Sequence, residues 1–267
     1  MSLAVPCAVL MCHAPIVLPE VGRRRAGECS ATTRGMREAA RRLVDSDPDV
    51  LVAISPHSPR RPDAWGLFRG PLLSGDFAMF GAPQVAHQFR VDPDAVEALE
   101  VAARAEGLAT WTPPDGPLDH GAMVPLHFVA EAGWKGPTVL LAMPWPGTAT
   151  EVAMGRAIAR AAEARGERWS VLASGDMSHR LKPGAPSGFH PRARDFDQAL
   201  VDAVTRGDLR GAASIDPDLR DLAAEDAVDS LTVAAAAVDW DSTGHERLCY
   251  EGPFGVGYME AVLHATS

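Results

Sequence analysis

The chain has 267 residues, of which 46% are hydrophobic and 22% charged, with a formal net charge of -10. Such an acidic composition excludes the clustered Lys and Arg that nucleic acids and anionic membranes require, and no apolar stretch reaches the roughly 18 residues of a membrane span. Length and apolar content predict a single α/β domain over residues 1–267, and the N-terminus has no signal-type segment, so a cytoplasmic protein is expected.

Three apolar runs, rich in β-branched residues, predict strands that are buried on both faces. They are Leu3–Met11, Leu51–Ser55 and Trp169–Ser174. A histidine follows each run within a few residues: His13, His57 and His179. Open α/β sheets bind their ligands at the carboxyl edge of the strands, so the three histidines are expected to share one site.

The remaining elements alternate between helix and strand. Helical spacing of apolar residues predicts a helix over 32–44, and Asp92-Pro93 with Gly107 predicts another over 93–106. Residues 138–143 predict a buried strand, 65–80 short strands or a hairpin, 81–90 a loop, and the end of the chain a final strand. This order predicts a three-layer αβα fold with a central, largely parallel mixed sheet.

Two imidazoles and one carboxylate form the ligand set of non-haem iron(II) oxygenases, and the same set serves catalytic zinc. His13 and His57 supply the imidazoles. Glu251 is the preferred carboxylate because Gly252, Pro253 and Gly255 crowd around it, as expected where backbone passes close to a site. An antiparallel final strand would bring Glu251 to the edge that carries the histidines.

Five segments resemble, in order along nearly the whole chain, the class III (LigB-type) extradiol ring-cleaving dioxygenases, whose wider superfamily includes the Memo-like proteins. These segments are Cys12–Pro15, Ser55–His57, Leu118–Leu126, Gly175–Leu181 and Tyr250–Gly252. The resemblance implies a LigB-like fold and iron(II), with zinc as a possible metal of the purified protein. It also implies that His13, His57 and Glu251 bind the metal and that His120 and His179 are catalytic.

The chemistry of ring opening suits these residue types. His179 is expected to carry a proton to and from a catechol-like or aminophenol-like substrate, and His120, oriented by Asp119, to hydrogen-bond substrate or oxygen. His190 is a candidate substrate-binding residue, whereas Asp176 is interpreted as a turn-former. The expected partners are a small aromatic substrate and O2, a second copy of the chain, and a small second subunit of the kind that some relatives use.

Two other functions remain open at this stage. A zinc-dependent hydrolase could use the same metal ligands, and a Memo-like protein could keep the fold while acting through partner binding. The presence of Glu251, His120 and His179 together favours an enzyme.

The four cysteines lack CxxC spacing, so they predict neither a structural zinc site nor a disulfide framework; they are Cys7, Cys12, Cys29 and Cys249.

Overall fold

An eight-stranded sheet forms the centre of the molecule. The computed structural model describes residues 4–145 and 150–266. The strands lie side by side in the order β6 (Ala109–Trp111), β3 (Ala64–Leu67), β7 (Thr138–Ala142), β2 (Val50–Ser55), β8 (Trp169–Ser174), β1 (Cys7–Met11), β10 (Tyr258–Ala265) and β9 (Glu246–Glu251).

The four central strands, β7, β2, β8 and β1, run parallel to one another. Met11 pairs with Ser174 and Ile54 with Ala173, so β1, β2 and β8 end at the same edge. The flanking strands β3 and β10 run antiparallel to the central four. The predicted central, largely parallel mixed sheet is therefore confirmed.

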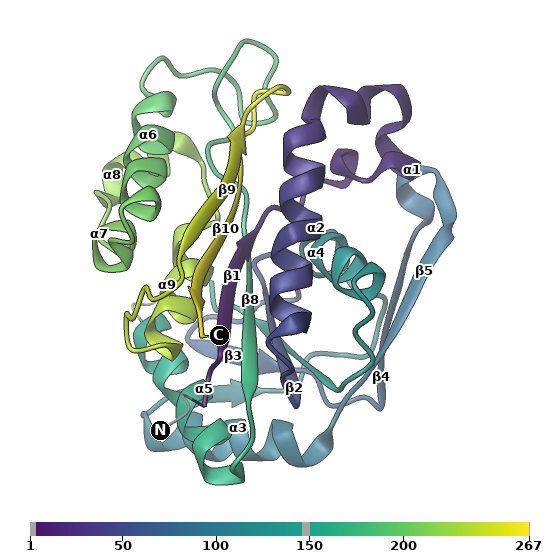
Figure 1. The fold of residues 1–267 in the computed structure, drawn as a ribbon, viewed down its shortest axis with the longest axis vertical. Coiled ribbons are helices and arrows are strands. Elements are labelled where there is room, and N and C mark those ends of the chain that lie inside the picture. The colour runs from purple at the N-terminus through teal and green to yellow at the C-terminus, as the bar shows by residue number, and fades with distance from the viewer. Residues whose placement is uncertain (1–3, 146–149, 267) are drawn as a thin grey trace.

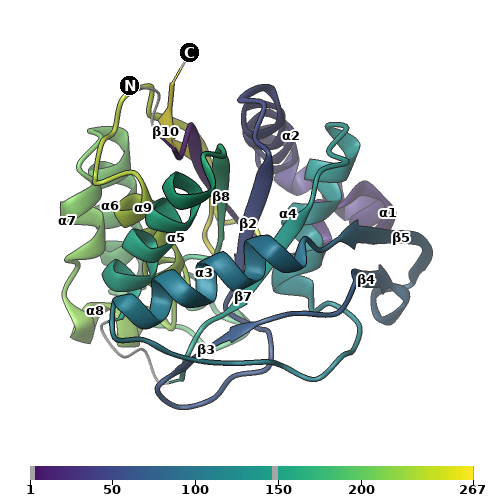
Figure 2. The same ribbon diagram turned by 90° about the horizontal axis from the view of Figure 1, so that it is seen from below.

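Helices cover both faces of the sheet, which gives three layers (Figures 1 and 2). One face carries α2 (Ser30–Asp45) and α4 (His120–Glu131), with the short α1 (Pro19–Gly22) beyond them. The other face carries α5 (Glu151–Arg165) and α9 (Val228–Ala237), flanked by α3 (Pro93–Ala105), α6 (Ala193–Thr205), α7 (Leu209–Ala213) and α8 (Pro217–Ala223). The predicted helices over 32–44 and 93–106 correspond to α2 and α3.

A two-stranded ribbon lies apart from the main sheet. Its first strand falls within residues 65–80, for which short strands or a hairpin were expected, and its second within 81–90, for which a loop was expected. β4 (Leu72–Phe77) pairs antiparallel with β5 (Ala82–Arg90), so the prediction of a loop over 81–90 is wrong. Most β5 side chains are at least partly exposed, and only Ala82 and Phe89 are buried. Because so few of its side chains are buried, the sequence of β5 lacks the regular alternation of apolar and polar residues that identifies a half-buried strand.

All four cysteines are buried and unpaired. None of the helices in the described part of the chain has both the length and the apolar character needed to cross a membrane.

Candidate metal centre

Two histidines from strands on either side of β8 meet beyond the edge of the sheet. His13 follows the last residue of β1 by two positions, and His57 follows the last residue of β2 by two. Because β8 lies between these strands, the two rings approach each other over its end. Their Nε2 atoms are 3.0 Å apart.

A serine at the end of β8 fixes which nitrogen of His13 carries the proton. The Ser174 hydroxyl lies 2.5 Å from the carbonyl oxygen of Gly121 and 3.0 Å from His13 Nδ1. A carbonyl oxygen can only accept, so the hydroxyl donates to Gly121 and accepts from His13 Nδ1–H. The lone pair of His13 is then on Nε2, the atom that faces His57.

Asp226, in the connection between α8 and α9, supplies a carboxylate to the same point. Its Oδ2 lies 3.2 Å from His57 Nε2 and 3.6 Å from His13 Nε2. Its Oδ1 accepts a hydrogen bond of 2.7 Å from the backbone N–H of Asp176, and the Asp226 N–H donates to the Asp176 carbonyl at 3.1 Å. This reciprocal pair holds Asp226 against the end of β8.

Gly175 makes that close approach possible. A Cβ atom on Gly175 would lie 2.3 Å from Ala227 Cα, a separation at which backbone must move. The absence of a side chain at the end of β8 therefore lets the connection that carries Asp226 lie directly over the strand.

Asp226 was not predicted from the sequence. An acidic pair ahead of a helix is typical of helix capping, and Glu225 has that role, since its Oε2 accepts from the N–H groups of Ala227 and Val228. No strand ends at Asp226, so the rule that identified the histidines does not apply to it. Its tertiary contacts with Asp176 and the two imidazoles distinguish it from a second capping residue.

Glu251, the expected carboxylate ligand, is not brought to the histidines. It ends β9, which is separated from β1 by β10, and adjacent strands lie about 4.8 Å apart. Its Oε1 accepts hydrogen bonds from the N–H and the hydroxyl of Thr32, at 2.7 and 2.6 Å, in the first turn of α2. The expectation that Glu251 converges with His13 and His57 is therefore corrected.

His120 is the third histidine of the cluster. It is the first residue of α4, and its ring stacks on that of His57, with centroids 4.3 Å apart and planes 29° apart. Ligand nitrogens of His13, His57 and His120 all lie within 4.8 Å of one another. Burial, followed by the charges of His57 and His13, lowers the pKa of His120 to about 4, so its ring is neutral at pH 7.

Asp119 positions His120 through the backbone. Its carboxylate accepts from the hydroxyls of Ser55 and Ser58, at 2.7 and 2.6 Å, and from the N–H of Ala122 at 3.1 Å. It thus caps α4 and ties the start of that helix to the end of β2. His120 is the first residue of the helix that this cap holds, and the expected effect of Asp119 on the His120 ring stays a prediction.

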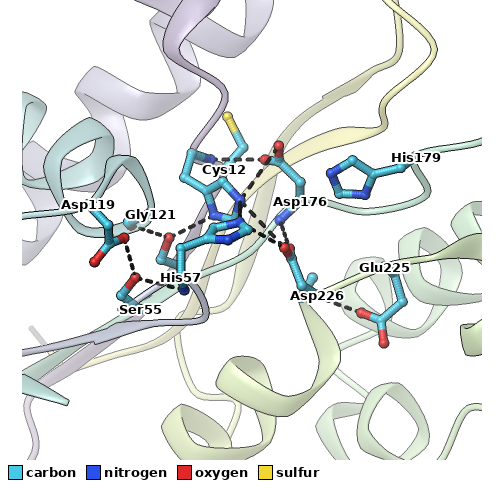
Figure 3. A network of polar contacts seen from close by, with 12 residues as sticks. Cys12, Ser55, His57, Asp119, Gly121, Asp176, His179, Glu225 and Asp226 are labelled. Atoms are coloured by element: carbon cyan, nitrogen blue, oxygen red, sulfur yellow. Dashed lines mark hydrogen bonds and ion pairs between the residues drawn. The ribbon is translucent and has the colours of Figure 1, made fainter. Parts of the chain in front are cut away.

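His179 lies beyond Asp176, away from His57 (Figure 3). Its Nδ1 is 2.7 Å from the carbonyl oxygen of Ala224, and its backbone N–H donates to the Ala223 carbonyl at 3.0 Å. Since the carbonyl can only accept, Nδ1 carries the proton and Nε2 holds the lone pair.

His190 lies elsewhere. Its ring Nδ1 accepts from the Arg192 N–H at 3.2 Å, and it is not among the described residues that line the cavity beside His57.

Electrostatics at the centre favour one anionic carboxylate. Burial lowers the pKa of His13 to about 4 although the charge of Asp226 opposes this. Burial also acts to lower the pKa of His57, but the hydrogen bond and charge of Asp226 prevail and raise it. Burial and the charge of Asp226 raise the pKa of Asp176, whereas the imidazoles overcome burial and lower the pKa of Asp226. Asp226 is therefore the ionised member of the carboxylate pair.

This donor set fits a divalent metal. Ligand atoms that bind one ion at about 2.0–2.2 Å, in tetrahedral or octahedral geometry, lie roughly 3–3.5 Å from their neighbours. The separations between His13 Nε2, His57 Nε2 and Asp226 Oδ2 are 3.0, 3.2 and 3.6 Å. His13 presents a lone pair there and Asp226 a negative charge, which are the states that metal binding requires.

A cavity of about 1030 Å³ adjoins the centre. His57 and Asp226 line it together with Met143, Pro144 and Trp145 from the segment after β7. A molecule in this cavity can therefore reach the two groups, while His13, 1% exposed, lies behind them.

Fold and site together define an αβα protein with a candidate mononuclear metal centre at the carboxyl edge of its sheet. A family model described as the catalytic LigB subunit of aromatic ring-opening dioxygenase matches residues 7–260. The chain belongs to this family. The match confirms the resemblance on which the expected fold and activity rest.

Two relatives extend the comparison. The chain is 29% identical over 267 residues to Protein CA_C1420 of Clostridium acetobutylicum, covering 97% of this chain and 57% of that protein. It thus spans little more than half the length of that relative. The fold is similar to a crystal structure of the protein JW3007 from Escherichia coli K12, with a TM-score of 0.66, 17% identity, and coverage of 96% of this chain and 98% of that one.

Proposed function

We propose that this chain is an iron(II)-dependent extradiol dioxygenase, which opens the ring of a catechol-like or aminophenol-like substrate with O2. The observation that carries the proposal is the convergence of His13 Nε2, His57 Nε2 and Asp226 Oδ2 within 3.6 Å of one another beside a cavity. Two imidazoles and one carboxylate are the ligand set of non-haem iron(II) oxygenases. Membership of the LigB family supports the same reaction class.

His13, His57 and Asp226 would hold the iron. When bound, iron(II) acidifies a coordinated hydroxyl of the diol and supplies the electron density that O2 needs. The overall reaction breaks one ring C–C bond next to the diol and places both atoms of O2 in the product, which ends in a carboxylate and an aldehyde.

The remaining histidines differ in what they offer. His120 is neutral at pH 7 and stacks on His57, so it can hydrogen-bond the diol without repelling the metal. His179 has its Nδ1 proton committed to the Ala224 carbonyl, which leaves Nε2 to accept the proton of the second hydroxyl and to return it later. The acid/base role is therefore proposed for His179.

The test uses protein purified without oxygen and loaded with iron(II) or zinc in parallel. A panel of catechols and aminophenols is supplied, O2 uptake is followed with an electrode, and the yellow ring-opened product by absorbance. We expect uptake and product in equal amounts with iron(II) and none with zinc. Hydrolysis supported by zinc without O2 uptake would establish the zinc-dependent hydrolase instead. The absence of turnover with either metal would favour a Memo-like binding protein.

A further inference from the structure

Asp197 is a buried carboxyl group that the proposed reaction does not use. It lies in α6, which packs against β9 (Figure 1), and it is only 1% exposed. Its Oδ2 accepts a hydrogen bond of 2.7 Å from the Tyr250 hydroxyl of β9, and its Oδ1 accepts one of 2.9 Å from the backbone N–H of Ser178. The carboxyl group therefore joins α6 and β9 to the residue directly before His179.

A carboxylate can accept both of these hydrogen bonds, whereas an amide cannot. An asparagine would accept from Ser178 with its oxygen, but its nitrogen can only donate, so the Tyr250 hydroxyl would lose its acceptor. Burial raises the pKa of Asp197 to about 7, although the hydrogen bonds from Tyr250 and Ser178 oppose this. The chain thus buries a group that is costly to bury, at a position where a neutral amide would hold only one of the two partners.

Gly257 brings the turn between β9 and β10 against the same segment. The Gly257 N–H donates to the Ser178 carbonyl oxygen and the Met177 N–H to the Gly257 carbonyl oxygen, both at 2.9 Å. A Cβ atom on Gly257 would overlap Asp197 Oδ2, so a side chain there would displace the carboxylate. The backbone that leads to His179 is therefore held both by this turn and by Asp197.

His179 itself is held from a different direction. Its Nδ1–H and its backbone N–H donate to the carbonyl oxygens of Ala224 and Ala223, at the end of α8. This segment continues to Asp226, the proposed metal ligand. A shift of Ser178 would therefore move the His179 ring relative to the metal centre, and a misplacement of about 1 Å can lower a rate about 100-fold.

We propose that Asp197, fixed by Tyr250, is a positioning residue that keeps His179 aligned for proton transfer. The inference rests on the proposed function for the role of His179 as the proton carrier. Asp197 is not among the described residues that line the cavity, so its effect on the reaction passes through the segment that carries His179. Loss of either hydrogen bond should slow the proton step while metal and substrate binding remain.

The first measurement does not depend on turnover. Amide hydrogen exchange is followed by NMR in the zinc-loaded chain, and exchange at Ser178 and His179 should become about 10-fold faster in Asp197→Asn and about 3-fold faster in Tyr250→Phe. Exchange at Leu172, inside β8, should change less than about 2-fold. Zinc content and melting temperature are measured first. If Asp197→Asn does not fold, Tyr250→Phe, which keeps the carboxylate, provides the test.

The second measurement uses the iron(II)-loaded chain and a catechol that it opens. Both variants should lower kcat about 10- to 100-fold and change KM and iron content less than about 2-fold. The solvent deuterium isotope effect on kcat should rise because proton transfer becomes the slow step. Asp202→Asn is the matched control: Asp202 is exposed on the same helix, accepts from Gln198 at 2.8 Å, and its variant should match the unaltered chain in both measurements.

Two outcomes would overturn the inference: unchanged amide exchange at His179 in both variants, or a loss of kcat that is matched by loss of iron or a rise in KM. Its failure is distinguishable from failure of the proposed function. If the unaltered chain opens diols and both variants do so at the same rate, the dioxygenase activity stands and the role of Asp197 is wrong. If both variants speed exchange at His179 but the unaltered chain opens no diol with iron(II) and O2, the restraint on His179 stands and the dioxygenase proposal is wrong.

Discussion

Ser174 Oγ lies 3.0 Å from His13 Nδ1 and donates its own hydrogen bond to the Gly121 carbonyl, 2.5 Å away. This contact orients the His13 ring and leaves its Nε2 lone pair at the metal centre. A strand-end serine thus controls the chemical state of a histidine that a different strand carries.

Replacing Ser174 with alanine should therefore weaken metal binding. His13 would lose the acceptor that fixes its tautomer, and the loss of such a supporting contact typically lowers metal affinity about 10- to 100-fold. Competition with a chromophoric chelator measures the affinity for zinc. Ser170→Ala is the control, since Ser170 is also buried in β8 but contacts Ser46. Equal affinities of the two variants would contradict the role of Ser174.

Gly175→Ala should displace the segment that carries Asp226. The new Cβ would lie 2.3 Å from Ala227 Cα, so the backbone must shift, at a typical cost of about 1–3 kcal/mol in unfolding free energy. We expect a lower urea midpoint together with weaker zinc binding. Gly116→Ala is the control because its Cβ would meet nothing within 4 Å. A variant at Gly175 that keeps full metal affinity would show that Asp226 is not held by this approach.

His179→Gln should separate proton transfer from metal binding. With a neutral amide in place of the proton carrier, turnover should fall about 10²- to 10⁴-fold while iron content remains near that of the unaltered chain. His13→Ala should lose its iron. Iron content and single-turnover rate are measured on the same samples. Loss of iron from His179→Gln as complete as from His13→Ala would make His179 a ligand.

Glu260 predicts a pH dependence of stability. Burial raises the pKa of Glu260 to about 8, and its carboxyl group contacts the Cys249 thiol and the Cys12 N–H. The folded chain therefore holds a proton between pH 4.5 and 8 that the unfolded chain has released. The contribution of Glu260 to the unfolding free energy is fully present below pH 4.5, the pKa of this carboxyl group in the unfolded chain. It falls as the pH rises from there towards 8, by at most about 1.4 kcal/mol per pH unit.

Glu260→Gln should remove this loss because its amide is neutral at every pH and offers one acceptor and one donor to the same partners. Urea unfolding at pH 5.5 and pH 7.5 gives the difference for each chain. Glu97→Gln, on the exposed side of α3, should behave like the unaltered chain. An identical pH slope in Glu260→Gln would show that Glu260 is ionised in the folded protein.

The fold and two of the three proposed metal ligands, His13 and His57, follow from local sequence. The runs that end near Ser55 and Met11 are apolar enough to be strands only if both faces are covered, and parallel strands then place His57 and His13 at one edge. That prediction needs the direction of the strands but not their order. The strand order, in which β8 separates β1 from β2, determines that the two rings meet over Gly175.

The carboxylate could not be predicted in this way because it depends on tertiary contacts between distant segments. Glu251 has the glycine-rich surroundings of a site residue, yet β10 lies between its strand and β1, and Thr32 binds its carboxylate. Asp226 resembles an ordinary residue ahead of a helix. Its place follows from its reciprocal hydrogen bonds with Asp176, 50 residues earlier.

The measurement that tests this account most directly is the iron content of Asp226→Asn beside that of Glu251→Gln, both purified without oxygen. The account predicts that Asp226→Asn, which removes the anionic oxygen 3.2 Å from His57 Nε2, loses most of its iron, whereas Glu251→Gln retains it. Melting temperatures of the metal-free chains show whether each variant is folded. Retention of iron by folded Asp226→Asn, with loss of iron from folded Glu251→Gln, would contradict the account and make Glu251 the ligand.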